Sequence, residues 1–192
     1  MPRQALTPDD WAMAALDALA RGGVAAVSIE ALARELGATR GSFYWHFPNR
    51  DAVLTAALHL WERRATDEII AAAEREPDPR RRLRRLLHDA VTVDPVPGLE
   101  PSIAAHAGHP AVAPVLRRVT TRRIDFLARC YAGLGATPAL ARRQAVLAYA
   151  AYLGWMDLRH TAEADVPETA EGGRVAARAL AHFVDTLAGP AD

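Results

Sequence analysis

The sequence contains no lysine, a single cysteine (Cys130) and few aromatic residues. One cysteine cannot form an internal disulfide, so nothing in the sequence indicates an oxidising compartment. No apolar run approaches the ~18 residues needed to cross a bilayer. The first residues, MPRQALTPDDW, also lack the apolar core of a signal peptide. We therefore expect a cytoplasmic protein.

Hydrophobic residues make up 51% of the chain but aromatic residues only 6%, so alanine, leucine and valine must build most of the core. Alanine and leucine favour helices, and no sustained alternation of apolar and polar residues indicates a strand. The sequence therefore predicts an all-α fold of about nine helices. The formal net charge is zero, which argues against broad electrostatic affinity for nucleic acid but leaves room for a local contact patch.

Residues 28–51, SIEALARELGATRGSFYWHFPNRD, have the pattern of a helix-turn-helix motif. An apolar stripe at i, i+3, i+4 and i+7 marks the first helix, which Ser28 caps. Gly37 follows the stripe, where a left-handed residue ends a helix. Thr39 then caps a second helix that we expect to run through Phe47, and Pro48 stops it.

The second helix of the motif has one buried and one exposed side. Phe43 and Phe47, at i and i+4, anchor it in a core, whereas its other side carries polar groups that a phosphate backbone can bind. Arg40 lies in the first turn, where a recognition helix meets base edges, and Gly41 lets the backbone approach closely. The expected DNA-binding residues are Ser28, Thr39, Arg40, Gly41, Ser42, Tyr44, Trp45, His46 and Arg50. The alternative is a helical bundle in which these aromatic residues serve packing only.

The helices around the motif suggest two domains. Thr7-Pro8 starts a first helix that ends at Gly22-Gly23, and Asn49 opens a long helix of about residues 49–75. We expect a DNA-binding domain over residues 1–48 and a helical domain over residues 49–192, with the long helix linking them. Further helices are expected to begin at Pro79, near Ser102, at Pro114, at Thr137-Pro138 and near residue 170. The arginine-rich run 80–85 is either a solvated helix face or a phosphate-binding patch.

Residues 7–54, and above all GATRGSFYWHFPNRDAVL (37–54), closely resemble the tetracycline-repressor (TetR/AcrR) family of transcriptional regulators. The resemblance implies a bacterial homodimer, usually a repressor, that binds a pseudo-palindromic DNA operator and is released by a small-molecule effector in its C-terminal half. It also implies that Arg40 and Gly41 read bases, that the other DNA-binding residues contact the backbone, and that two helices, about 137–160 and 170–188, form the dimer interface.

The C-terminal half offers aromatic and histidine side chains as candidate effector-binding residues: Trp61, His88, His106, His109, Phe126, Tyr149, Tyr152 and Trp155. Core packing explains several of them equally well, and the last three lie on the expected interface helix. The histidines lack a compact metal-ligand spacing, so we expect no metal and no cofactor. Ser102 and His106 have no third orienting group, so we do not expect an enzyme. A DNA-binding dimer without effector response, and a helical small-molecule enzyme, remain as alternatives.

Overall fold

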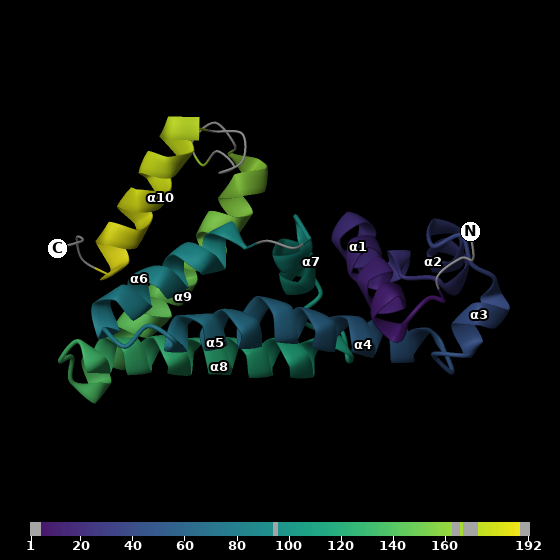
Figure 1. Ribbon diagram of the computed structural model, residues 1–192, viewed down its shortest axis with the longest axis horizontal. Coiled ribbons are helices and arrows are strands. Elements are labelled where there is room, and N and C mark those ends of the chain that lie inside the picture. Colours follow the sequence, from purple (N-terminus) through teal and green to yellow (C-terminus); the bar gives the residue numbers. More distant parts are fainter. Residues whose placement is uncertain (1–4, 94–95, 163–165, 167–172, 189–192) are drawn as a thin grey trace. The chain divides into compact units, whose positions relative to one another are not determined.

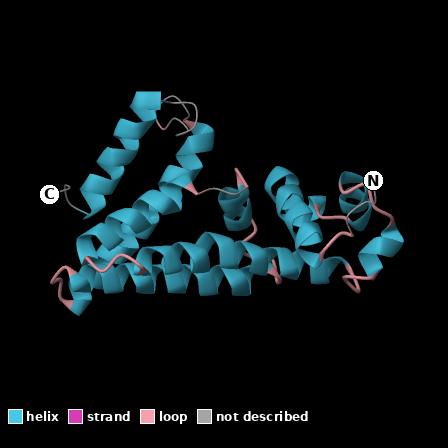
Figure 2. Ribbon diagram, viewed as in Figure 1, coloured by secondary structure: helices cyan, strands magenta, loops and turns pink. Residues whose placement is uncertain are grey.

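The structure, a computed structural model, describes residues 5–93, 96–162, 166 and 173–188. Every regular element in these residues is a helix, which confirms the all-α expectation (Figure 2). Within the described part of the chain the helices number nine when the uninterrupted run α4–η1–α5 counts as one. They are α1 (Pro8–Ala26), α2 (Ile29–Glu35), α3 (Arg40–Tyr44), α4 (Arg50–Glu62), the π-helical turn η1 (Arg63–Asp67), α5 (Glu68–Glu74), α6 (Pro79–Thr92), α7 (Leu99–Ala105), α8 (Val112–Gly133), α9 (Pro138–Thr161) and α10 (Gly173–Ala188).

Side-chain caps start most of these helices at the predicted residues. The Thr7 hydroxyl accepts a bond from the Asp10 backbone N–H, and the Asp10 carboxylate accepts one from the Thr7 N–H in return, a capping box. Equivalent N-cap bonds are made by Ser28, Thr39, Asn49, Asp78 and Thr137. Each cap satisfies a backbone N–H that the helix itself leaves without a partner.

Several helix ends differ from the prediction. The prediction that the second motif helix runs through Phe47 is wrong, because α3 ends at Tyr44 and a turn follows in which the His46 and Phe47 N–H groups both bond the Phe43 carbonyl. The helix expected from Ser102 begins earlier, at Leu99. Pro101 is tolerated there because the N–H groups of a first turn have no helical partner. Residues 170–172, the expected start of the last helix, lie outside the described residues.

By its contacts the chain divides into two units, which we call unit 1 (residues 1–64 and 96–118) and unit 2 (residues 65–95 and 119–192). Unit 1 thus includes α4 and α7 as well as the first three helices (Figure 1). The expected division of function between residues 1–48 and 49–192 remains a prediction.

In unit 1, α1 packs against α2, α4 and α7. The backbone of α1 leaves helical geometry at the expected pair Gly22-Gly23, where Gly23 has φ of 66°, and one further turn reaches Ala26. The ring of His106 fills the space that a side chain at position 23 would need, since a Cβ there would lie 2.3 Å from its Cε1. The His106 Nδ1 also lies 2.8 Å from the Ser102 carbonyl. The His106 side chain therefore packs between α7 and the end of α1.

In unit 2, residues of α5, α6, α8, α9 and α10 share one apolar core. Cys130 is buried in it, and burial raises the pKa of its thiol to about 11. The Tyr131 hydroxyl donates to the Leu187 carbonyl at 2.9 Å, which ties α8 to α10. No helix in the described residues is long and apolar enough to cross a membrane.

Candidate nucleic-acid interface and pocket

The helix-turn-helix of unit 1 consists of α2, a tight turn and α3. Gly37 has φ of 59°, the left-handed conformation expected of a helix-ending glycine, and the Ala38 N–H bonds back to the Ala33 carbonyl at 2.8 Å. Phe43 is completely buried and meets the Trp11 ring edge-to-face at 5.3 Å. These contacts hold α3 rigidly on α1 and leave its opposite side open.

The open side of α3 exposes the residues expected to meet DNA. Trp45 is 89% exposed and Tyr44 is 51% exposed, which is a large aromatic area on the surface for two residues. Arg40 and Gly41 are exposed, whereas Ser42 and His46 are half-buried. The exposed face of this helix can therefore bind a surface that carries hydrogen-bond acceptors.

Thr39 and Ser28 lie at helix N-termini, as phosphate-binding hydroxyls require. Their hydroxyl oxygens already accept cap bonds from the Ser42 and Ala31 N–H groups, both at 3.2 Å. Each hydroxyl proton can still be donated to a phosphate oxygen.

Two arginines of the motif have protein partners that the sequence does not reveal. Arg40 forms an exposed ion pair with Glu30 of α2 at 3.2 Å. The Arg50 guanidinium donates to the backbone carbonyls of Val24 and Val27, at the end of α1. Arg50 therefore ties α4 to α1 in this structure, and its expected contact with phosphate remains a prediction.

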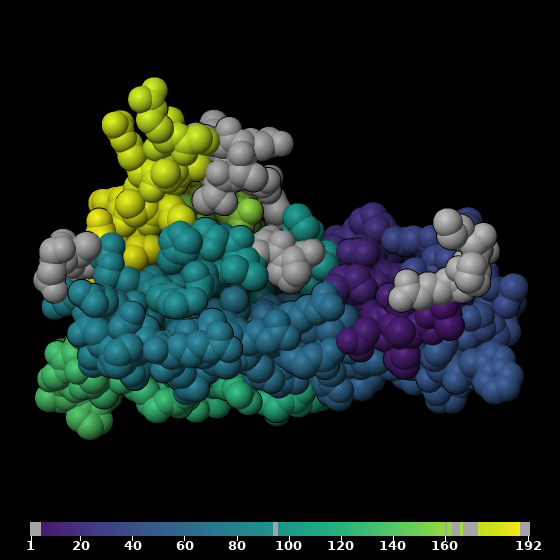
Figure 3. Space-filling model, in the orientation of Figure 1, coloured from purple at the N-terminus to yellow at the C-terminus, as the bar shows by residue number. Residues whose placement is uncertain are grey.

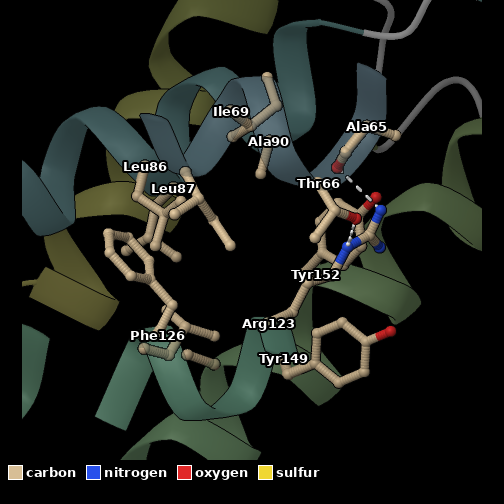
Figure 4. Close-up of a pocket in the computed structure, with 13 residues that line it drawn as sticks. Ala65, Thr66, Ile69, Leu86, Leu87, Ala90, Arg123, Phe126, Tyr149 and Tyr152 are labelled. Atoms are coloured by element: carbon tan, nitrogen blue, oxygen red, sulfur yellow. Dashed lines mark hydrogen bonds between the residues drawn. The ribbon is translucent and has the colours of Figure 1, made fainter. Parts of the chain in front are cut away.

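Unit 2 contains a partly open pocket of about 50 Å³ (Figure 4). Most of its wall is apolar and comes from four helical segments: Ile69, Ile70, Leu86, Leu87, Ala90, Phe126, Leu127 and Ala148. The polar groups gather at one end, where Arg123, Thr66, Tyr149 and Tyr152 lie (Figure 4). A pocket of this composition is typical of a site for a small apolar molecule with a polar group.

The polar end is organised around Arg123 of α8. Its Nε donates to the Thr66 hydroxyl and its Nη2 to the Ala65 carbonyl, both at 2.9 Å. Its guanidinium also lies 5.5 Å from the centre of the Tyr152 ring, within the range of a cation–π contact. Ala65 and Thr66 belong to the π-helical turn η1, and such turns occur frequently at functional sites.

Only some of the candidate effector-binding residues lie at this pocket. Phe126, Tyr149 and Tyr152 line it. His88 is exposed on α6 beside Asp89, and Trp155 packs on Phe183 with ring centres 4.8 Å apart. The other three candidates belong to unit 1. The Trp61 indole N–H donates to the Glu100 carboxylate, and His109 accepts a bond from the Ala111 N–H. The His106 ring packs against Gly23.

Thr66 and Arg123 are not among the residues predicted from the sequence, although the position of Arg123 in the sequence is unusual. It follows Val119 by four residues and precedes Phe126 by three, so a charged residue lies on the apolar stripe of α8. No group of three or more histidine, cysteine, aspartate or glutamate side chains in the described ranges could hold a metal.

The fold and the exposed second helix of the motif are those of helix-turn-helix DNA-binding transcriptional regulators. Residues 13–57 match the sequence model of the family described as bacterial regulatory proteins, tetR family. This match confirms the resemblance seen in the sequence of the helix-turn-helix region.

Solved structures with the same fold include three informative neighbours. A transcriptional regulator from Rhodococcus sp. Rha1 is 23% identical with a TM-score of 0.74, over 96% of this chain and 95% of that one. A putative transcriptional regulator from Saccharomonospora viridis in complex with choline is 20% identical with a TM-score of 0.73, over 94% of both chains. AibR in complex with isovaleryl coenzyme A and operator DNA is 18% identical with a TM-score of 0.66, over 94% of this chain and all of that one.

Proposed function

We propose that the protein is a cytoplasmic, homodimeric repressor that binds a pseudo-palindromic operator and is released from it by a small-molecule effector. The observation that carries the proposal is the exposed face of α3 and of the turn after it, which presents Arg40, Tyr44 and Trp45 and is anchored by the buried Phe43. Two further features support it, an apolar face on α9 and the pocket of unit 2.

The proposed contact with DNA divides the residues of the motif by role. Arg40, in the first turn of α3, reads a guanine edge, and Gly41 beside it allows the backbone to come close. Tyr44, Trp45 and His46 donate to phosphates from the same face, together with the hydroxyls of Ser28, Thr39 and Ser42 and the guanidinium of Arg50. Charge supports this placement, because residues 36–50 contain two arginines and no acidic residue.

The proposed dimer interface is the outward face of α9 and α10. Apolar side chains of α9 lie exposed along one side of the helix: Leu140, Val146, Leu147, Leu153 and Leu158. Gly154 lies among them with open space beyond its Cα, so another helix can approach closely there. Val175 of α10 is 66% exposed, and Figure 3 shows the outer side chains of that helix (yellow) uncovered. Apolar area of this extent marks a protein–protein interface.

The proposed effector site is the pocket of unit 2. The structures of this fold with choline and with isovaleryl coenzyme A contain small molecules of opposite charge, so the fold by itself does not select a ligand class. The groups of this chain's own pocket must set its preference.

Selection of bound duplexes from a random DNA pool tests the proposed operator recognition. We expect an inverted repeat and a binding constant that falls steeply with salt, because each phosphate contact releases counterions. A pool without sequence preference would overturn the proposal. Loss of operator binding on addition of an effector would separate the repressor from a dimer that binds DNA constitutively.

A charged substitution in the apolar face tests the dimer. Leu147→Glu places a carboxylate at a residue that is 58% exposed in the single chain, so the monomer should fold normally while the dimer dissociates. The matched control is Leu134→Glu, an exposed leucine of unit 2 that lies in the turn between α8 and α9. Sedimentation velocity should find a monomer only for the first variant. Dimers in both variants would place the interface elsewhere.

A further inference from the structure

The pocket of unit 2 offers a ligand mainly hydrocarbon. Among the thirteen described residues that line it, nine have apolar side chains and one, Arg123, is charged. Leu86, Leu87 and Phe126 lie at the end of the pocket away from Arg123 (Figure 4). A ligand that enters the pocket therefore exchanges water for an apolar surface over most of its area.

The guanidinium of Arg123 is bound to the protein itself. It donates to the Thr66 hydroxyl and to the Ala65 carbonyl, both at 2.9 Å, and it lies 5.5 Å from the centre of the Tyr152 ring. Thr66 is only 1% exposed, so a ligand that took over this donor would leave a deeply buried hydroxyl without its bond. Arg123 thus holds η1 on α8 and forms part of the pocket wall.

From this wall we propose that the effector is a small uncharged molecule that enters the pocket with a branched apolar group of a few carbon atoms. This inference rests on the proposed function, because it names the chemical class that the effector pocket accepts.

The lining disfavours ligands of either charge. An anion would compete with Thr66 and Ala65 for the donors of Arg123 and would break the bonds that hold η1. A cation would find no carboxylate among the described residues that line the pocket. Each would also lose its hydration shell against an apolar wall, and burial of a charge without a partner costs far more than burial of a neutral group.

The size of the pocket limits the group that enters it. Protein cores contain few voids larger than a water molecule. An ordered water needs about two to four polar partners, and the side chains of Leu86, Leu87 and Phe126 have no polar atoms. An apolar group is therefore the better occupant of this end. An engineered cavity that binds benzene has about 150 Å³, whereas this pocket has about 50 Å³, so a short branched group fits better than a ring.

Titration of the full-length protein with matched probes tests the charge. The probes are isobutanol, sodium isobutyrate and isobutylammonium chloride, which share a branched apolar body, all at pH 7 and constant ionic strength. Ligand-detected NMR should show isobutanol binding at least about tenfold more tightly than either ion, because only the ions lose a strong hydration shell. Among these probes isobutanol alone should raise the melting temperature at low concentration.

Variants locate the site. Ala90→Leu places a larger side chain into the pocket from a half-buried position, so it should weaken isobutanol about tenfold or more. The matched control is Ala71→Leu, an exposed alanine of α5 that does not line the pocket, and it should leave binding unchanged.

A second variant keeps the test valid if Ala90→Leu does not fold. Phe126→Leu removes part of a ring from the wall and widens the pocket. Benzene should therefore bind this variant at least about tenfold more tightly than the unaltered protein. Equal binding of benzene to both proteins would show that the ligand lies elsewhere.

The outcomes separate this inference from the proposed function. If isobutyrate or isobutylammonium binds as tightly as isobutanol, or if Ala90→Leu binds isobutanol normally, the assignment of an uncharged ligand to this pocket is wrong. Absence of isobutanol binding also overturns it. None of these results affects the recovery of an inverted repeat from random DNA, which tests the repressor itself.

Discussion

Units 1 and 2 differ in where their proposed functional residues lie. In unit 1 these residues are on the surface, and in unit 2 they are in the interior. In unit 1 the core is dense, with Trp11 and Phe43 fully buried, and the residues proposed to act lie outside on α3. In unit 2 the exposed apolar residues are proposed to form a dimer interface, and the residues proposed to bind an effector lie inside, around a cavity. Functional residues on a surface can be recognised because aromatic side chains there are unusual. Functional residues in the interior resemble the apolar residues that any core contains.

Replacing one buried phenylalanine by alanine in each unit should have the largest of the expected effects. The effect on operator binding should differ between the two units. Phe43→Ala removes the anchor of α3 and should destabilise the protein by about 3–5 kcal/mol with complete loss of operator binding. Phe126→Ala removes a wall of the pocket and should enlarge the cavity while operator binding persists. Chemical denaturation and gel-shift assays measure both effects. Loss of operator binding in both variants would contradict the division between the units.

Among the residues proposed to bind DNA, those that read bases and those that contact the backbone should differ in their effect on sequence specificity. Arg40→Ala should cost about 1–3 kcal/mol and relax specificity at one position of each half-site, because a guanine loses its bidentate partner. Tyr44→Phe removes one hydroxyl and should weaken all sequences alike. Binding to operators with single base changes distinguishes the two. Uniform weakening by Arg40→Ala would assign that arginine to the backbone.

The ion pair between Arg40 and Glu30 should oppose binding slightly. Both side chains are exposed, and pairs of this kind are worth about 0.2–1 kcal/mol. Glu30→Gln frees Arg40 and removes a negative charge near the phosphates, so operator affinity should rise up to about fivefold. The control is Glu35→Gln on the same helix, where Glu35 pairs with Arg21 at 2.7 Å. Equal gains in both variants would indicate a general effect of charge.

The smallest effect concerns the capping box of α1. Hydrogen bonds from the Thr7 backbone N–H and hydroxyl lower the pKa of Asp10. A carboxylate with a lowered folded-state pKa stabilises the protein at neutral pH, and this contribution is lost as the pH falls through that pKa. Asp10→Asn should therefore lower the melting temperature at pH 7 but not at a pH where Asp10 is protonated. A difference that persists in acid would contradict this account.

The features of the fold that the sequence predicts are those that depend on residues close together in the chain. Caps, the turn glycine and the i, i+4 pair Phe43 and Phe47 act within a few residues, so the motif and its exposed face can be recognised from the sequence. The end of α3 was placed too late, since the turn after Tyr44 uses helix-like hydrogen bonds to Phe43. Tertiary hydrogen bonds also escape such reasoning, as the bonds of Arg50 to carbonyls of α1 demonstrate.

The pocket could not be predicted, because its residues come from distant parts of the sequence. Arg123 and Thr66 are 57 positions apart, and only the fold brings them together. Tyr149, Tyr152 and Phe126 were expected to bind ligand merely as aromatic residues, and the same reasoning selected His88 and Trp155, which lie elsewhere. A charged residue on an apolar stripe, as at Arg123, is the better guide to a buried site.

The π-helical turn η1 also has an evolutionary consequence. A π-helical turn holds one residue more than an α-helical turn, so it can arise by insertion of a single residue into a helix. In a relative that lacks this residue the helix would continue regularly, and the Ala65 carbonyl would no longer lie where Arg123 meets it. The extra residue and the arginine should therefore have been gained and lost together among related chains.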